Sequence, residues 1–132
     1  MVIGFKANAL LNEFGKPEAI EFGSAVFAEN GTFEEIWLYE IGFNRFPIAL
    51  GMKQGTCITA KEMSGTQYRR YRDWKYAETR NQLLGQSQVQ VERLLGGEVF
   101  FPDAYSLGPA GVVKVKFQGD RCVSTELLEI TH

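Results

Sequence analysis

The sequence predicts an α+β fold, in which short helices pack on one face of a mainly antiparallel sheet. Residues 7–17 and 87–97 each have the pattern of a short amphipathic helix that ends at glycine. Each of these stretches is followed by a strand-like segment and later by a hairpin, so two related helix–strand–hairpin units are also expected. With 132 residues, the chain is predicted to form one domain, 1–132, because compact domains typically hold about 100–150 residues.

The first helix is predicted by the spacing of its apolar residues. They recur at i, i+3, i+4 and i+7 and so share one helical face: Ala7, Leu10, Leu11 and Phe14. Gly15 can adopt the left-handed backbone that ends a helix, and Pro17 cannot continue one. A helix this short depends on docking onto the sheet for its stability.

The second helix is predicted mainly by its start. Ser87 and Gln90 have the spacing of a capping box, in which each side chain satisfies a free backbone amide of the first turn. The expected buried stripe then consists of Val91, Leu94 and Leu95. Two glycines end the helix.

The first predicted hairpin is centred on Asn30-Gly31, the strongest two-residue signal for a type I′ turn. The turn joins a strand in residues 22–29 to a strand in residues 32–42. The second of these strands is apolar on both faces, at Ile36, Trp37 and Leu38. Such a strand is expected at the centre of the sheet.

Two loop lengths predict different registers for the last hairpin. A two-residue loop at Gly119-Asp120 places Phe117 opposite Cys122 and mixes polar with apolar side chains farther along the strands. A three-residue loop at 119–121 gives the pairs Phe117 with Val123, Val115 with Thr125, and Val113 with Leu127. A slip of one residue sends every side chain to the wrong face, so the second register is the prediction.

The rest of the chain gives a weaker pattern. Residues 43–59 are expected to form a loop with a short strand around 57–59, and residues 102–110 a second loop. Residues 66–84 fit one helix, or a strand through 68–74 followed by a second, shorter helix. The single helix is favoured.

Composition limits the class of protein. The formal net charge of −2 gives no global attraction to nucleic acid or to an anionic membrane. Residues 61–80 nevertheless hold six basic and three acidic groups between acidic flanks. No apolar run approaches ~18 residues and no secretory signal is recognised, so no membrane span and a cytoplasmic location are expected. Cys57 and Cys122 are therefore expected to be reduced and mostly buried.

No residue pattern predicts catalysis, a metal or a cofactor. The single histidine, His132, stands at the end of the sequence, where neighbours that fix its tautomer are rare. Cys57 would need a nearby base or helix N-terminus to act as a nucleophile, and a buried structural thiol is favoured instead. Glu34 and Glu35 are consecutive on a strand and point to opposite faces, so they cannot share a proton. The prediction is no catalytic residue, no metal and no cofactor.

The order of elements resembles a known small module. A helix, Gly, Lys-Pro and a strand are followed by a hairpin with Trp-Leu-Tyr-Glu at 37–40, and residues 87–96, 112–117 and 121–123 follow a similar order. This order resembles the helix-plus-sheet module of the small lipoprotein of the outer-membrane β-barrel assembly machinery, which the secreted β-lactamase inhibitor protein carries in tandem. The chain lacks the lipobox cysteine, and residues 43–84 have no counterpart. The resemblance implies a protein-binding module without chemistry.

One tract combines cationic and aromatic residues at high density. Its predicted partner-binding residues are Tyr68, Arg69, Arg70, Tyr71, Arg72, Trp74 and Lys75. Arginine and aromatic side chains are enriched at protein interfaces and also stack on nucleic-acid bases. The simplest interpretation is an amphipathic helix whose aromatics enter the core and whose arginines are solvated.

The favoured function is a non-enzymatic protein-interaction module, such as an adaptor, accessory subunit, inhibitor or immunity-type protein. Its expected partner is another protein with an acidic surface, recognised by the cationic tract. One alternative is a small apolar-ligand-binding or lyase-like protein that uses the aromatic face of the sheet. A second alternative is binding of nucleic acid or another polyanion through residues 68–80, which the acidic net charge disfavours.

Overall fold

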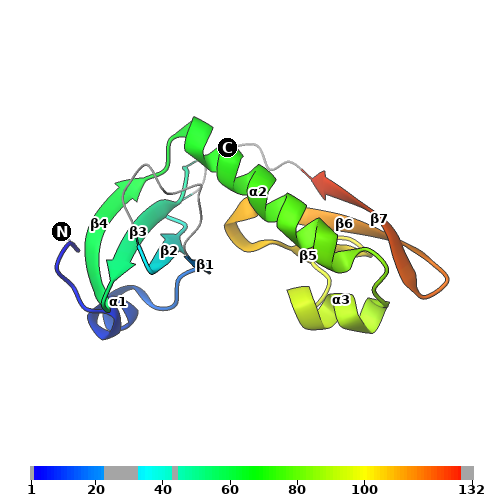
Figure 1. Cartoon of the computed structure of the whole chain (residues 1–132), viewed down its shortest axis with the longest axis horizontal. Coiled ribbons are helices and arrows are strands. Elements are labelled where there is room, and N and C mark those ends of the chain that lie inside the picture. The colour runs from blue at the N-terminus through cyan, green and yellow to red at the C-terminus, as the bar shows by residue number, and fades with distance from the viewer. Residues whose placement is uncertain (1, 23–32, 43–44, 129–132) are drawn as a thin grey trace. The chain divides into compact units, whose positions relative to one another are not determined.

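The computed structural model describes residues 2–22, 33–42 and 45–128. These residues form three α-helices and two antiparallel sheets, which confirms the predicted α+β class. The chain divides into two compact units, unit 1 up to Arg70 and unit 2 from Tyr71. The division falls inside the long helix α2 (Gly65–Leu83), and each unit combines one sheet with a short helix (Figure 1).

Unit 1 contains α1 (Ala7–Phe14) and a four-stranded antiparallel sheet. The strands are neighbours in chain order: β1 (Ala19–Phe22), β2 (Glu35–Tyr39), β3 (Ile48–Lys53) and β4 (Thr56–Glu62). The predicted first helix is confirmed, and Gly15 ends it with φ of 77°. Any other residue would be strained there, because side chains disfavour positive φ.

The core of unit 1 lies between α1 and one face of its sheet. Leu10 is the buried residue of α1. It belongs to a cluster with Trp37, Leu50, Met52 and Cys57. We call this face of the sheet the helix-side face and the opposite one the far face. Because β2 is paired with β1 and β3 and is buried on both faces, the predicted central strand is confirmed.

The first hairpin differs from the prediction in its register. Phe22 lies opposite Glu35, whereas a two-residue turn at Asn30-Gly31 would place it opposite Tyr39. The predicted turn itself lies outside the described residues. The two registers differ by four residues, so each side chain keeps its face: Ile20 lies beside Trp37 on the helix-side face, and Glu21 beside Ile36 on the far face.

The prediction of a loop over residues 43–59 is wrong for β3, although the strand around 57–59 is confirmed as part of β4. β3 and β4 are joined by Gln54-Gly55, whose φ values are 51° and 74°. Two positive φ values match the twist of a hairpin. Such turns are usually recognised by Asn or Asp at the first position, so Gln54 did not indicate a turn in the sequence.

The single helix favoured for residues 66–84 is confirmed by α2. Ser64 accepts a hydrogen bond of 3.1 Å from the Gln67 amide, and its carbonyl accepts one from the Tyr68 amide. These two bonds satisfy backbone donors of the first turn, which otherwise have no partner within a helix.

Unit 2 contains the second part of α2, the helix α3 (Gln88–Leu95) and a three-stranded antiparallel sheet. The strands are β5 (Ala104–Ser106), β6 (Val112–Gln118) and β7 (Arg121–Leu128), with the 3₁₀ turn η2 (Gly108–Ala110) between β5 and β6. The Tyr76 and Thr125 hydroxyls lie 2.8 Å apart, so α2 lies against the face of this sheet that carries Thr125. In unit 2 we call this face the helix-side face and the opposite one the far face.

Two further predictions concern unit 2. The predicted second helix is confirmed as α3, and the Ser87 hydroxyl accepts from the Gln90 amide at 3.3 Å. Of the expected buried stripe, Val91 is buried, but the prediction is wrong for Leu94, which is 49% exposed. The prediction of a loop over residues 102–110 is wrong for β5, which pairs with β6 over three residues. Its brevity explains the miss, because a strand of three residues shows too little alternation to be recognised.

The last hairpin combines both registers that the sequence allowed. Away from the turn, Val115 lies opposite Thr125 and Val113 opposite Leu127, as predicted. Near the turn, the loop is Gly119-Asp120 and Phe117 lies opposite Cys122, so the predicted Phe117–Val123 pair is wrong. A β-bulge inserts Val123 as an extra residue and reconciles the two registers. The bulge keeps the Cys122 side chain buried and leaves Val123 exposed.

The two units repeat the same local structure. Gly4 and Phe5, just before α1, form two backbone hydrogen bonds with Cys57, of 2.7 and 2.8 Å. Gly85 and Gln86, just before α3, form the same pair of bonds with Cys122, both of 2.8 Å. The preceding turns also match, as Phe5 N–H bonds the Val2 carbonyl and Gln86 N–H bonds the Leu83 carbonyl, each at 3.0 Å.

The correspondence extends through the helices and hairpins. Leu10 and Val91 are the buried residues of α1 and α3, and both helices have eight residues and end at a glycine with positive φ. Each hairpin has a two-residue loop and a bulge at the same distance from it, with Ile58 or Val123 as the extra residue. Both cysteines are free and buried, one before each bulge, and both thiols donate to the carbonyl two residues on.

Candidate functional site

The predicted partner-binding residues all lie on α2, and the structure separates them by burial. On the unit 1 side, Tyr68 is 3% exposed and its ring lies 5.3 Å from the Phe46 ring. On the unit 2 side, Tyr71 is fully buried and its ring lies 6.1 Å from the Trp74 ring. Tyr68 and Tyr71 therefore anchor the helix and offer no free surface in this chain.

The other predicted residues reach the surface of α2. Arg69 and Arg70 are exposed, whereas Trp74 and Lys75 are partly exposed. The Lys75 ammonium lies 5.8 Å from the centre of the Trp74 ring, within the range of a cation–π contact. These residues combine an aromatic surface with positive charge.

Arg72 is held more firmly than its neighbours. Its side chain is 17% exposed, and its guanidinium lies 3.4 Å from the Asp73 carboxylate, which is 69% exposed. An ion pair of this length with an exposed partner contributes little to stability. Asp73 nevertheless offsets part of the positive charge of the tract.

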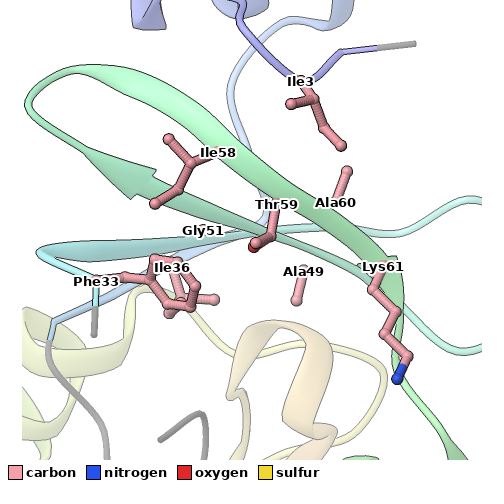
Figure 2. A pocket seen from close by; sticks show the side chains of 9 residues that line it. All are labelled: Ile3, Phe33, Ile36, Ala49, Gly51, Ile58, Thr59, Ala60 and Lys61. Atoms are coloured by element: carbon pink, nitrogen blue, oxygen red, sulfur yellow. The ribbon is translucent and has the colours of Figure 1, made fainter. Parts of the chain in front are cut away.

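A second candidate site, which the sequence did not predict, extends from the outer edge of β4 across the far face of the sheet to Ile36 of β2. A hollow of about 280 Å³ is lined mostly by apolar and small residues. Its lining consists of Ile3, Phe33, Ile36, Ala49, Gly51, Ile58, Thr59, Ala60 and Lys61. Figure 2 shows Ala60 and Ile3 on one side of β4, and Thr59, Ala49 and Lys61 on the other.

Gly51 makes room at the base of this hollow. A Cβ atom at this position would lie 2.5 Å from Thr59 Oγ1 and 2.7 Å from the Phe33 ring. The Phe33 ring therefore lies directly against the backbone of β3. The small residues Ala49, Gly51 and Ala60 alternate with larger ones in the sequence. This alternation could have indicated a hollow, but its meaning is clear only once the strands are paired.

Unit 2 has a hollow at the corresponding place, with different chemistry. Its volume is about 530 Å³, and its lining includes Asp103, Lys114, Lys116, Ser124 and Glu126. The four residues from β6 and β7 lie on the far face of the sheet, in the pairs Lys114–Glu126 and Lys116–Ser124. The hollow of unit 1 is thus lined mainly by apolar residues, and that of unit 2 mainly by charged and polar ones.

Both described cysteines are free and buried. Burial raises the pKa of the Cys57 and Cys122 thiols, so both are protonated and unreactive near neutral pH. In residues 2–22, 33–42 and 45–128, no three His, Cys, Asp or Glu side chains are close enough together to hold a metal ion. No described helix has both the length and the apolar composition needed to cross a membrane.

Comparison with protein-family models, curated proteins and solved structures gives no match for this chain. The resemblance to the lipoprotein module therefore stays a prediction. The internal repeat is instead established by the chain's own hydrogen bonds.

Proposed function

We propose that this protein is a non-enzymatic interaction module that binds an acidic partner protein through the exposed side of α2. The observation that carries the proposal is the Trp74 ring, which stays partly exposed beside the Lys75 ammonium although Tyr68 and Tyr71 of the same helix are buried. Tryptophan and arginine are the residues most often dominant at protein interfaces. The contact between Lys75 and Trp74 gives this surface both charge and apolar area.

Electrostatics favour an acidic partner over nucleic acid. Arg69 and Arg70 are exposed on α2, and the chain as a whole has a net charge of −2. A local cationic surface on an acidic protein attracts an acidic patch but weakly attracts an extended polyanion. Binding to a polyanion predicts retention on heparin with a steep dependence on salt.

The alternative of a small apolar ligand has a weaker basis. The hollow of unit 1 is lined from both sides of an edge strand, so it does not enclose a compact molecule. Phe33 is its one aromatic lining residue. Native mass spectrometry of the freshly purified protein distinguishes the two functions, because a retained small molecule supports the ligand and a retained second chain supports the partner.

The test uses the complex that co-purifies with the full chain from its native host. Arg70→Ala and Trp74→Ala are each expected to weaken this complex by tenfold or more, on the order of a typical interface hot spot. Arg80→Ala, an exposed arginine farther along α2, is the matched control and should leave the affinity unchanged. Affinity is measured by surface plasmon resonance, and stability by the thermal midpoint.

Stability distinguishes a binding role from a structural one. If Trp74→Ala lowers the thermal midpoint strongly and Arg70→Ala leaves the affinity intact, the tract is part of the fold and the proposal is wrong. A weakened complex with an unchanged thermal midpoint supports it.

A further inference from the structure

We propose that the outer edge of β4 in unit 1 is a second docking site, which takes an extended acidic segment of a partner protein as an added strand. The segment lies beside residues 58–62 of β4. This inference goes beyond the proposed function, because it concerns different residues and a different mode of recognition.

The edge is open where the segment docks. β4 is the last strand in the sheet order, and the chain before α1 pairs with it only at Thr56 and Cys57. The bulge at Ile58 then ends this pairing, and no described residue pairs with the outer edge beyond it. Cys57 directs its amide and carbonyl outward, and past the bulge the alternation of an antiparallel strand brings Ala60 into the same position.

The hollow is shaped for a strand. Successive side chains of a strand point to opposite faces, so an added strand needs space on both sides of the sheet. The hollow offers this space, with Ile3 and Ala60 on the helix-side face and Ala49 and Thr59 on the far face (Figure 2). Its small apolar residues leave room for apolar side chains at alternate positions of the segment.

The positive charge of Lys61 favours a segment that carries acidic residues. Lys61 is exposed on the far face and forms no ion pair with any described residue. The neighbouring Glu62 already has a cationic partner, since its carboxylate lies 3.0 Å from the Arg45 guanidinium. A carboxylate in the segment, placed across from Lys61, forms the opposite-charge pair that stabilises neighbouring strands.

The equivalent edge strand in unit 2 is β7, and charged side chains surround it. Positions that hold Gly51 and Ala49 in unit 1 hold Lys116 and Lys114 in unit 2, and Glu126 replaces Lys61. Charged side chains next to an edge strand are a common protection against unwanted strand pairing. The two edges therefore differ in the side chains on the neighbouring strand, which are small at Ala49 and Gly51 in unit 1 and charged at Lys114 and Lys116 in unit 2.

The test begins with a random heptapeptide library on phage, selected against the full chain. Enriched peptides are expected to alternate apolar residues and to carry Asp or Glu. The leading peptide is then synthesised with a fluorescent label, and its affinity is measured by fluorescence polarisation. Binding is also expected to slow hydrogen exchange at the Ala60 amide, measured by NMR.

Two variants test whether the peptide binds at the outer edge of β4. Lys61→Glu is expected to weaken binding by about tenfold, because it turns an attractive cross-strand pair into a repulsive one. Ala60→Pro is expected to abolish binding, because it removes the outward amide at a position where an edge strand tolerates proline. Lys116→Glu, on an exposed strand lysine of the other sheet, is the matched control and should leave the affinity unchanged.

Four results would overturn the inference. The first two are a library that enriches no peptide and a peptide whose affinity is unchanged by Lys61→Glu. The other two are a small apolar molecule retained by the protein in native mass spectrometry and self-association of the protein that Ala60→Pro abolishes. Arg70→Ala and Trp74→Ala should not change the affinity of the peptide. The failure of this inference is therefore separable from the failure of the proposed α2 surface.

Discussion

Unit 1 and unit 2 share a backbone plan but differ in the surfaces built on it. In both, the segment before a short helix is bonded to a buried cysteine, and a bulge follows that cysteine. The far face is apolar around Gly51 in unit 1 and carries Lys114 and Lys116 in unit 2. The comparison teaches that a few buried positions and glycines maintain the plan, whereas the far face can differ: Ala49 and Gly51 are buried in unit 1, and Lys114 and Lys116 are exposed in unit 2.

The equivalent buried residues Leu10 and Val91 test whether the two units are stable independently. Leu10→Ala should cost about 2–5 kcal/mol of unfolding free energy, because it leaves a cavity in a well-packed core, and Val91→Ala should cost less because a smaller group is removed. Trp37 belongs to unit 1 and Trp74 to unit 2, so their NMR indole signals report on each unit during urea unfolding.

Coincident loss of both indole signals in each variant would support the prediction of a single domain. If Leu10→Ala shifts only the Trp37 transition, and Val91→Ala only that of Trp74, the units unfold separately and the single-domain prediction is wrong.

Gly51 and Lys116 occupy equivalent positions of β3 and β6, but replacement by alanine should destabilise the protein only at Gly51. Gly51→Ala is expected to cost about 1–3 kcal/mol, because the new Cβ overlaps the Phe33 ring and Thr59. Lys116→Ala should change stability by less than about 0.5 kcal/mol, as expected of an exposed site. Chemical denaturation measures both, and equal effects would contradict the difference between the two far faces.

The two thiols should make stability fall at alkaline pH. Burial raises the pKa of Cys57 and Cys122 above their ordinary value of 9.0, so the folded state keeps these protons longer than the unfolded state does. The stabilisation is complete below pH 9 and is lost as pH rises through the folded pKa, by at most about 1.4 kcal/mol per pH unit for each thiol. Urea unfolding between pH 7 and 10 measures this slope.

The matched control is the double variant Cys57→Ala and Cys122→Ala. Its stability should decline less between pH 9 and the onset of tyrosine ionisation. An identical pH profile for the variant and the parent protein would show that the thiols are not responsible.

The helix starts give the smallest expected effect. Lys6 and Ser87 are equivalent N-cap residues with nearly the same extended backbone, but only Ser87 accepts a hydrogen bond from the helix. Ser87→Ala should lower the unfolding free energy by about 1 kcal/mol, and Lys6→Ser should raise it by a similar or smaller amount. Thermal denaturation of both variants checks this, and a destabilising Lys6→Ser would mean that the Lys6 side chain has a role of its own.

Local patterns predicted the parts of the fold that depend on neighbouring residues. The apolar spacing of α1, the Ser87 cap of α3 and the apolar run of β2 each needed only a short stretch of sequence. β3 was missed because Gln54 and Gly55 form an unusual turn, and its small residues make sense only beneath Phe33. The α2 tract was recognised from composition, but the burial of Tyr68 and Tyr71 could not be read from it.

The sequence by itself determined the class of fold, the ends of the short helices and the central strand, because glycine, proline, caps and apolar spacing act over a few residues. Only the tertiary structure decided the two bulges, the pairing of each cysteine with the segment before a helix, and the hollow at the β4 edge. These features depend on residues such as Gly4 and Cys57, which are far apart in the chain and meet only when the sheet is formed. The geometry of such contacts is set by packing and backbone hydrogen bonding across the whole unit, which no local pattern records.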